Sequence, residues 1–201
     1  MQISRTENTF KKKRPNYFAW VGGILLLMIL IWLLNSTAAT NFRNIGPDMI
    51  FTDAENVSGD FFVAENGQVK NGFTQSSEKA RSGTHSCKTG TGDGLQFGFS
   101  LDLTEFEKGK FYRTSVWRFQ ELEGEKGYLA VAADDGKSFY KNEVFPVAQE
   151  STGWEKLEIR FFIPPDAGWK KLNIHTYSTG DAVVYFDDFS FENKQRSRLS
   201  L

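Results

Sequence analysis

From about Met49 onward, apolar and polar residues alternate with a period of two, and turn residues separate the alternating runs. Residues 94–103, "GLQFGFSLDL", are one such run, with an apolar residue at every second position from Leu95. Successive side chains of a strand face opposite sides of a sheet, so each run predicts a strand. Further strands are predicted at 110–119, 127–133, 154–163, 170–178 and 182–191. Short strands at this spacing, without a long run of helical period among them, predict an all-β sandwich.

The N-terminal part of the chain predicts a membrane span. Residues 17–34 carry no charge, and as a helix they would extend about 27 Å, close to the thickness of a bilayer core. Basic residues precede this run and only Arg43 follows it closely, so the positive-inside rule predicts a cytoplasmic N-terminus. The competing interpretation is a cleaved signal peptide, because residues 35–40 include small residues of the cleavage type. Both interpretations place residues 41–201 outside the cytoplasm.

These features predict a domain organisation and a location. The chain divides into a basic cytoplasmic segment (1–16), a transmembrane helix (17–34), a linker (35–48), the sandwich domain (49–192) and a polar C-terminal tail (193–201). We expect a single-pass protein of the cell membrane, or a secreted domain if the N-terminal segment is cleaved.

Composition and motifs argue against two classes of function. The formal net charge is −1 and no basic domain or stripe is present, so nucleic acid is not an expected partner. The sequence contains no nucleophile elbow, phosphate loop or His-rich zinc motif, and the spacing of Glu143 and Glu158 does not support a glycosidase pair. The expectation is therefore a non-catalytic protein. The single cysteine, Cys87, cannot form an internal disulfide and is predicted to be a small buried side chain.

Four stretches together resemble a known family. They are "ARSGTHSCKTG" (80–90), "FEKGKFYRTSVW" (106–117), "STGWEKLEIRFFIPPDA" (151–167) and "VYFDDFSF" (184–191). In order and spacing they resemble the galactose-binding-like jelly rolls, specifically the carbohydrate-binding modules found beside cellulases and xylanases. The resemblance covers about residues 50–192 and implies a jelly-roll β-sandwich. Such modules usually accompany a catalytic domain, and this sequence is expected to depart from the pattern, because no catalytic domain is predicted within its 201 residues.

Two adjacent carboxylates interrupt the last predicted strand. Because neighbouring strand residues face opposite sides, either Asp187 or Asp188 should point where the aromatic residues point, and an unpaired buried carboxylate costs several kcal/mol. The resemblance implies a structural calcium ion bound by Asp187 and Glu55, with backbone carbonyls of residues 81–85. Calcium binds 6–8 oxygen ligands, which suits such a set. The alternative is an aspartate that accepts backbone N–H bonds or pairs with Lys or Arg.

Alternation also predicts a polar sheet face. In one strand Leu157, Ile159 and Phe161 share the core side, and in the next strand Leu172 and Ile174 do so. If these strands are neighbours, the opposite sides form one surface that could bind a sugar, with a tryptophan as the stacking platform. The predicted ligand-binding residues are Trp117, Glu158, Arg160, Trp169, Asn173, His175 and Tyr177. The alternative is an ordinary solvated sheet face. Trp154 is predicted to lie in the core, and Trp169, which follows a turn, is the tryptophan predicted to be exposed.

The function that these observations favour is non-catalytic binding of a polysaccharide or envelope glycan by an exported, membrane-tethered jelly roll. The expected partners are a glycan and, through the N-terminal helix, the membrane. The alternative is a protein–protein interaction or a structural role in the cell envelope with the same fold.

Overall fold

The computed structural model describes residues 49–90, 95–121, 127–179 and 183–193. The predicted cytoplasmic segment, transmembrane helix, linker and nearly all of the C-terminal tail lie outside these residues. Within the described part of the chain, no helix is long and apolar enough to cross a bilayer.

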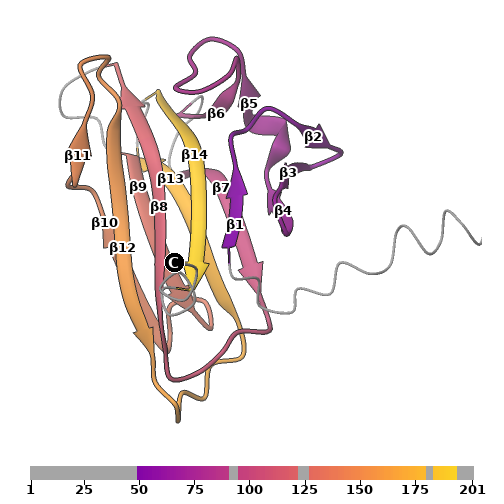
Figure 1. Cartoon of the computed structure of the whole chain (residues 1–201), viewed down its shortest axis with the longest axis vertical. Coiled ribbons are helices and arrows are strands. Elements are labelled where there is room, and N and C mark those ends of the chain that lie inside the picture. The colour runs from indigo at the N-terminus through magenta and orange to yellow at the C-terminus, as the bar shows by residue number, and fades with distance from the viewer. Residues whose placement is uncertain (1–48, 91–94, 122–126, 180–182, 194–201) are drawn as a thin grey trace, which may run out of the picture. The chain divides into compact units, whose positions relative to one another are not determined.

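The described strands form two antiparallel sheets that lie face to face (Figure 1). Sheet A contains β1 (Met49–Thr52), β5 (Gln75–Ser76), β6 (Ser86–Thr89), β8 (Lys110–Gln120), β11 (Ala148–Gln149), β12 (Glu155–Ile163) and β14 (Val184–Asn193). Sheet B contains β2 (Val57–Ser58), β3 (Phe61–Ala64), β4 (Gly67–Lys70), β7 (Leu95–Leu103), β9 (Gly127–Ala133), β10 (Phe139–Glu143) and β13 (Leu172–Thr179). A short 3₁₀ helix, η1 (Gly72–Thr74), joins β4 to β5.

The strand order identifies the topology. Sheet A has the order β11-β12-β8-β14-β6-β5, with β1 paired to β14, and sheet B has the order β10-β9-β13-β7-β4-β3-β2. From β6 onward the long strands pass from one sheet to the other, and the last strands, β13 and β14, pair between earlier ones. This interleaving of two Greek keys is the jelly-roll arrangement. It confirms the all-β jelly-roll sandwich predicted from the sequence.

The core lies between the two sheets and is built from the apolar side of each alternating run. Leu157, Ile159 and Ile174 are fully buried, as their alternation predicts. Trp154 and Cys87 are also buried, which confirms the two predictions made for them. Two such layers of inward-facing side chains are how a sandwich excludes water from its centre.

A β-bulge in β7 decides which side chains of that strand face outward. Ser100 pairs with His175 and Phe97 pairs with Tyr177, so Gly98 and Phe99 together oppose the single residue between them on β13. An extra residue of this kind turns the strand and reverses the side on which its side chains point. Phe99 is therefore buried in the core, whereas Phe97 is about half exposed. Simple alternation, which puts Leu95, Phe97 and Phe99 on one face, fails at this point.

A second bulge lies in β14 at the two adjacent aspartates. Asp187 pairs with Trp117 and Ser190 pairs with Ser115, so Asp188 and Phe189 oppose one residue of β8. Asp188 has a positive φ of 50°, in the left-handed region that Asp tolerates better than most residues. The extra residue lets the aromatic side chains before and after it face the core while Asp187 faces outward, on the same side as Trp117.

Candidate functional site

The predicted binding residues do not form one surface. Glu158 and Arg160 lie on β12 in sheet A, whereas Asn173, His175 and Tyr177 lie on β13 in sheet B. The prediction of a contiguous face across these two strands is wrong, because the jelly roll places β12 in sheet A and β13 in sheet B. The two sets therefore lie on opposite outer sides of the sandwich.

The outer side of sheet A holds side chains that mostly pair with one another. The Arg81 guanidinium lies over the Trp117 ring at 3.8 Å from its centroid, and it also bonds Glu150 at 2.6 Å. Glu158 receives a bond from Arg160 at 2.6 Å. One face of the Trp117 ring is thus already covered by a cation, and this arrangement does not suit the predicted role of a sugar-stacking platform.

Trp169 is not the exposed tryptophan that the sequence predicts. Its side chain is half-buried and packs against the edge of the core. Its ring stacks on that of Phe139 with a centroid distance of 5.2 Å. The turn that precedes Trp169 brings the indole back onto β10, so this residue covers apolar surface.

The outer side of sheet B carries five rings from four neighbouring strands, which we call the aromatic face. They are Phe97 on β7, Tyr128 on β9, Tyr140 on β10, and His175 and Tyr177 on β13. Tyr177 pairs directly with Phe97 on one side and with Tyr128 on the other. The rings of Tyr128 and Tyr177 stack at 4.8 Å with an interplanar angle of 8°, and Phe97 meets His175 edge-on at 5.5 Å. Sheet geometry thus assembles a continuous group of rings from distant parts of the sequence.

Exposure differs across the aromatic face. Tyr140 is 51% exposed and Phe97 is 48% exposed, so both offer ring surface to a ligand. Tyr177, one of the predicted ligand-binding residues, is only 9% exposed because its neighbours enclose it, so it offers almost no surface to a ligand. The outward positions of β9 beside Tyr128 are Ala130 and Ala132, and the larger side chains around them leave both buried. Tyr177 therefore packs against the neighbouring rings and holds them in place, and it exposes little ring surface of its own to a ligand.

Hydrogen bonds hold the polar members of this side in fixed positions. Asn142 donates to the Tyr177 hydroxyl at 3.2 Å. Asn173 donates to Asp102 Oδ1 at 2.7 Å, and its side-chain oxygen bonds His175 Nδ1. Three of these residues, Asn173, His175 and Tyr177, were predicted to bind ligand, and the structure places them along the outer side of β13. Groups that are ordered before binding lose less conformational entropy when a ligand arrives.

The protonation states follow from the same contacts. Burial lowers the pKa of His175 below its usual 6.5, only partly opposed by the Asp102 carboxylate, so the imidazole is neutral at pH 7. Burial alone would raise the pKa of Asp102, but the bonds from Lys70 and Asn173 and the Lys70 charge lower it overall. Burial, together with the bond to Tyr177, raises the pKa of Tyr140 to about 12. The face therefore presents neutral donors and acceptors around one paired carboxylate.

Several members of this side were missed by sequence reasoning. No strand was predicted at residues 139–143, so Tyr140 was not placed on this side, and simple alternation puts Phe97 on the same face as the buried Phe99. Tyr128 could have been found, because it alternates with two alanines in "GYLAVAA" (127–133) and so occupies the outward side of its strand. For Phe97 the only local indication is Gly98, a residue type that often marks a bulge.

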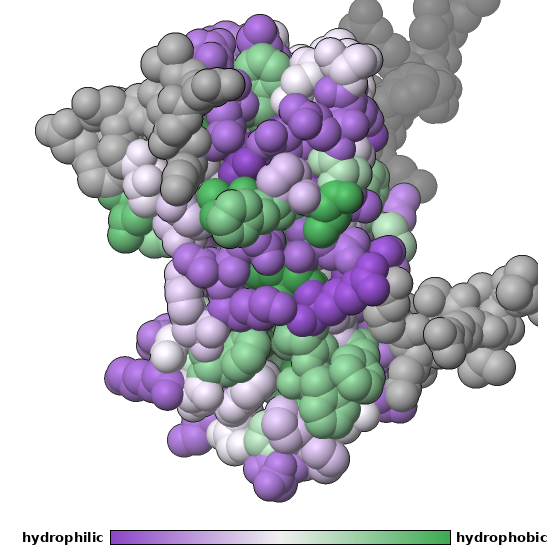
Figure 2. Space-filling view, turned by 90° about the vertical axis from the view of Figure 1, so that its left-hand side faces the viewer, coloured by the Kyte–Doolittle hydropathy of each residue, from purple (hydrophilic) through white to green (hydrophobic). Residues whose placement is uncertain are grey.

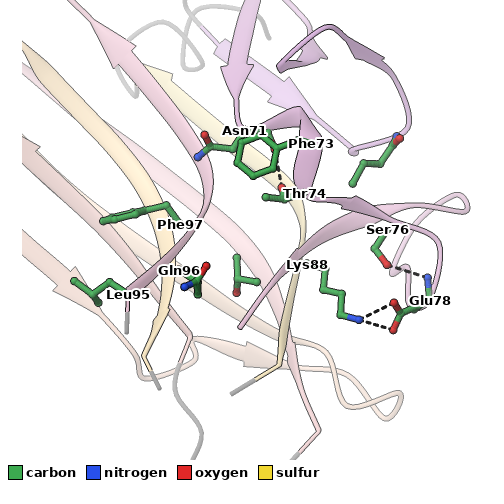
Figure 3. Close-up of a pocket in the computed structure, with 11 residues that line it drawn as sticks. Asn71, Phe73, Thr74, Ser76, Glu78, Lys88, Leu95, Gln96 and Phe97 are labelled. Carbon is green, nitrogen blue, oxygen red and sulfur yellow. Dashed lines mark hydrogen bonds and ion pairs between the residues drawn. The ribbon is translucent and has the colours of Figure 1, made fainter. Parts of the chain in front are cut away.

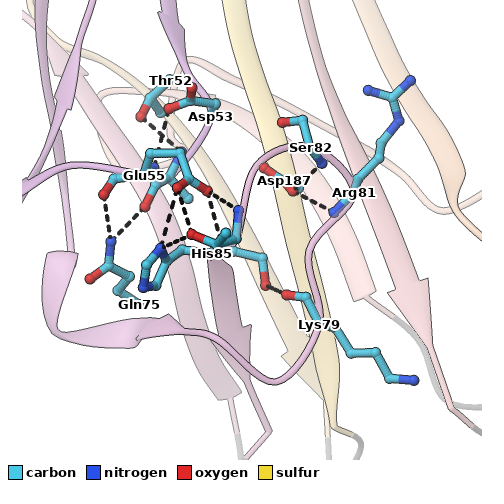
Figure 4. A network of polar contacts seen from close by, with 12 residues as sticks. Thr52, Asp53, Glu55, Gln75, Lys79, Arg81, Ser82, His85 and Asp187 are labelled. Carbon is cyan, nitrogen blue, oxygen red and sulfur yellow. Dashed lines mark hydrogen bonds and ion pairs between the residues drawn. The ribbon is translucent and has the colours of Figure 1, made fainter.

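The two residues proposed to bind calcium hold the loop before β6 from two sides (Figure 4). Asp187 accepts backbone N–H bonds from Arg81 at 2.7 Å and Ser82 at 3.2 Å. Glu55 accepts backbone N–H bonds from Thr84 and His85, both at 2.7 Å. The alternative interpretation of Asp187, a carboxylate satisfied by backbone N–H groups, describes what the structure shows.

These residues do not fit a calcium ion as they are arranged. The oxygens that would bind the ion already accept hydrogen bonds, including one from Thr84 Oγ1 to Glu55 at 2.9 Å and one from the Asp188 N–H to Asp187 at 2.7 Å. Among the residues that the structure describes, no three His, Cys, Asp or Glu side chains gather into a possible metal site. A calcium shell needs loop carbonyl oxygens where this loop presents N–H groups.

Comparison with known proteins gives a fold likeness only. No family model matches the chain, and no curated protein matches it. The CBM22-1 xylan-binding domain of Xyn10C from Paenibacillus barcinonensis is 20% identical over 72% of this chain and 94% of that domain, with a TM-score of 0.48. The C-terminal family 22 carbohydrate-binding module of Xyn10B from Clostridium thermocellum is 18% identical over 72% and 92%, with a TM-score of 0.49. A cyclase from Fischerella sp. TAU is 14% identical over 72% and 83%, with a TM-score of 0.42. One fold can host many unrelated functions, so the function of this chain is argued from its site.

Proposed function

We propose that this chain binds a polysaccharide or envelope glycan, without catalysis, on the aromatic face of sheet B. The observation that carries the proposal is the combination on one sheet side of exposed rings with amide, imidazole and carboxylate groups held by hydrogen bonds. Tyr140 and Phe97 supply ring surface, and Asn142, Asn173 and His175 supply polar atoms beside it.

The chemistry of a sugar ring matches this combination. A pyranose has C–H faces that pack against aromatic rings and hydroxyl groups that need paired donors and acceptors. Each hydroxyl gives up bonds to water when it binds, so a hydrogen bond contributes only about 1 kcal/mol net. We therefore expect dissociation constants of roughly micromolar to millimolar, equivalent to about −8 to −4 kcal/mol.

The decisive experiment compares two exposed aromatic residues on opposite sheets. The full-length chain is screened by affinity electrophoresis against xylan, mixed-linkage β-glucan, galactomannan and soluble cell-envelope polysaccharides. Tyr140→Ala should weaken binding about tenfold or more, because it removes a ring that is 51% exposed on the aromatic face. Phe111→Ala removes a ring that is 54% exposed on sheet A and should leave binding unchanged. If Tyr140→Ala and Phe111→Ala both bind the polysaccharide as tightly as the wild type, the aromatic face is not the binding site.

The cellular setting is part of the same proposal. The charge-free run at residues 17–34 and its basic flank support the proposal that the domain is exported on a single membrane span, where its aromatic face would meet envelope or extracellular glycans. Calcium binding by Asp187 and Glu55 would require the loop peptides to reorient, so that carbonyl oxygens replace the N–H groups that face these carboxylates.

A protein partner is the second candidate, and one feature favours it. On sheet A, Phe111 and Phe162 lie directly opposite each other, and both are exposed. On the side of the molecule where β10, β11 and β12 lie, Figure 2 shows apolar patches separated by a band of hydrophilic residues. Apolar surface of this kind often contacts proteins. Loss of a co-purifying protein from Phe111→Ala, together with a negative glycan screen, would support this alternative.

A further inference from the structure

A cavity of about 480 Å³ lies at one end of the aromatic face, between β7 and the segment that runs from η1 to β6 (Figure 3). Phe73 and Asn71 line it from one side, Leu95 and Phe97 from β7, and the Lys88 side chain from β6. Its volume lies within the range of small-molecule binding sites.

The apolar part of the lining is unusually exposed. Phe73 is 74% exposed and Leu95 is 58% exposed, although both are large apolar residues. Neither side chain belongs to the hydrophobic core. Apolar side chains that gather around a cavity without covering core surface are typical of a binding site.

Hydrogen bonds and an ion pair hold the polar side chains of the lining in place, and the charges of this ion pair cancel. Lys88 Nζ bonds both oxygens of the Glu78 carboxylate, at 2.6 and 2.7 Å, and the Tyr185 hydroxyl donates to Glu78 at 2.9 Å. Asn71 Nδ2 donates to the Gly98 carbonyl at 2.6 Å, which ties the cavity wall to the bulge of β7. Because Lys88 and Glu78 neutralise each other, this lining suits an uncharged polar ligand better than an anion or a cation.

Phe97 belongs to both the cavity and the aromatic face. Its ring centroid lies 5.5 Å from that of His175 and 6.3 Å from that of Tyr177, and the same side chain lines the cavity. The bulge at Gly98 turns Phe97 outward and so makes this double contact possible. A ligand that lies along the aromatic face can therefore reach the cavity by crossing one ring.

We propose that the cavity is an additional subsite for the same glycan chain, which extends from the aromatic face across Phe97 to Phe73. The inference rests on the proposed function, because it assigns a further part of the same ligand. Rings at the rim and balanced polar groups in the wall supply the contacts that a neutral pyranose unit needs. The affinity for the glycan should then increase once the glycan is long enough to occupy both the aromatic face and the cavity.

The test measures the dependence of affinity on chain length. Titration calorimetry of the full-length chain uses the trisaccharides and hexasaccharides of β-1,4-linked glucose, xylose and mannose. The wild type should bind one hexasaccharide at least about fivefold more tightly than its trisaccharide. Phe73→Ala should remove that difference and leave trisaccharide affinity unchanged, since Phe73 touches only the cavity end. Leu95→Ala should also reduce the preference for the hexasaccharide over the trisaccharide.

The matched control is Phe145→Ala, which removes a ring that is 76% exposed and does not line the cavity. This variant should keep the wild-type preference for the hexasaccharide. The inference is overturned if Phe73→Ala keeps the preference, if it weakens both lengths equally, or if the wild type shows no preference. In each of these cases the glycan-binding proposal survives. A wild type that binds no saccharide in the panel or the polysaccharide screen overturns both.

Discussion

At the scale of single residues, Asp187 explains how a strand rich in aromatic residues contains two adjacent carboxylates. The bulge at Asp188 and Phe189 adds one residue, so Phe186 and Phe189 both face the core while Asp187 faces outward. The loop before β6 then covers Asp187, and backbone N–H groups of this loop satisfy it. Period-2 alternation predicts that one carboxylate enters the core, and the extra residue removes that requirement.

The first prediction concerns the pH dependence of stability. Burial raises the pKa of Asp187 from 3.8 to about 7, against the opposing effect of the Arg81 N–H bond. The folded state therefore binds a proton more tightly than the unfolded state, so its stability falls as the pH rises from about 4 to about 7. Because one proton is involved, the free energy of unfolding cannot change by more than about 1.4 kcal/mol per pH unit. Urea unfolding at several pH values should show this fall, and Asp187→Asn should flatten it.

The pKa of Glu55 is shifted in the opposite direction to that of Asp187, so Glu55 affects the pH dependence of stability differently. Burial alone would raise its pKa, but the bonds from Thr84 and His85 outweigh this and lower it to about 2. Its contribution to stability is therefore present above the unfolded-state pKa of 4.5 and is lost only as the pH falls towards 2. A wild-type stability that rises between pH 4 and 7 would contradict the raised pKa of Asp187.

The second prediction concerns calcium. Because loop N–H groups already occupy the oxygens of Asp187 and Glu55, we expect the melting temperature to be the same in a chelator and in millimolar calcium. A calcium ion that binds only the folded state would instead stabilise it by about 2.7 kcal/mol at 100 times its dissociation constant. A rise in melting temperature with calcium that Asp187→Ala abolishes would show that the loop reorients to bind the ion.

At the scale of strands and sheets, alternation predicts which side of a strand is buried but not which sheet the strand joins. Leu157 and Ile174 are buried as predicted. Yet Arg160 and His175 lie on opposite sides of the molecule, because the jelly roll sends β12 and β13 to different sheets. Local periodicity contains no information about pairing between distant strands. The sequence therefore predicts the fold class and the buried sides, and only part of the candidate site.

The third prediction concerns the close contact that the β7 bulge requires. A Cβ atom on Gly98 would lie 2.6 Å from Thr176 Oγ1 and 2.8 Å from Cys87 Sγ. Gly98→Ala should therefore destabilise the domain by about 1–3 kcal/mol through overpacking. At about 2–4 °C for each kcal/mol, the melting temperature should fall by roughly 2–12 °C.

Gly168→Ala is the matched control for this substitution. A Cβ atom at Gly168 would meet no atom within 4 Å, so the change should stay within about 0.5 kcal/mol. Both variants replace glycine by alanine and alter the unfolded chain in the same way, so their difference isolates the contact in the folded state. Equal melting temperatures for the two variants would mean that β7 relaxes away from Thr176 at little cost.

At the scale of the whole molecule, the two outer sides of the sandwich have different chemistry. On sheet A, Arg81 pairs with Glu150 and Asp188, and Arg160 pairs with Glu158, so the charged groups largely satisfy one another. On sheet B, exposed rings lie beside amide and imidazole groups, and the cavity at Phe73 adjoins them. Rings beside ordered polar groups, rather than mutually paired charges, are what a neutral sugar needs, and this difference supports the proposal that a glycan binds on sheet B.

The fourth prediction concerns how the chain is placed in the cell. Residues 17–34 carry no charge, basic residues precede them and only Arg43 follows closely, so the C-terminus should lie outside the cytoplasm. Alkaline phosphatase, which is active only after export, should be active when fused after Leu201 in a bacterial host. The control is the same fusion without residues 17–34, which should accumulate as an inactive protein in the cytoplasm. Activity of that control would assign export to another segment. A full-length fusion that is stable but inactive would place the sandwich, and with it the aromatic face, inside the cell, where extracellular glycans cannot reach it.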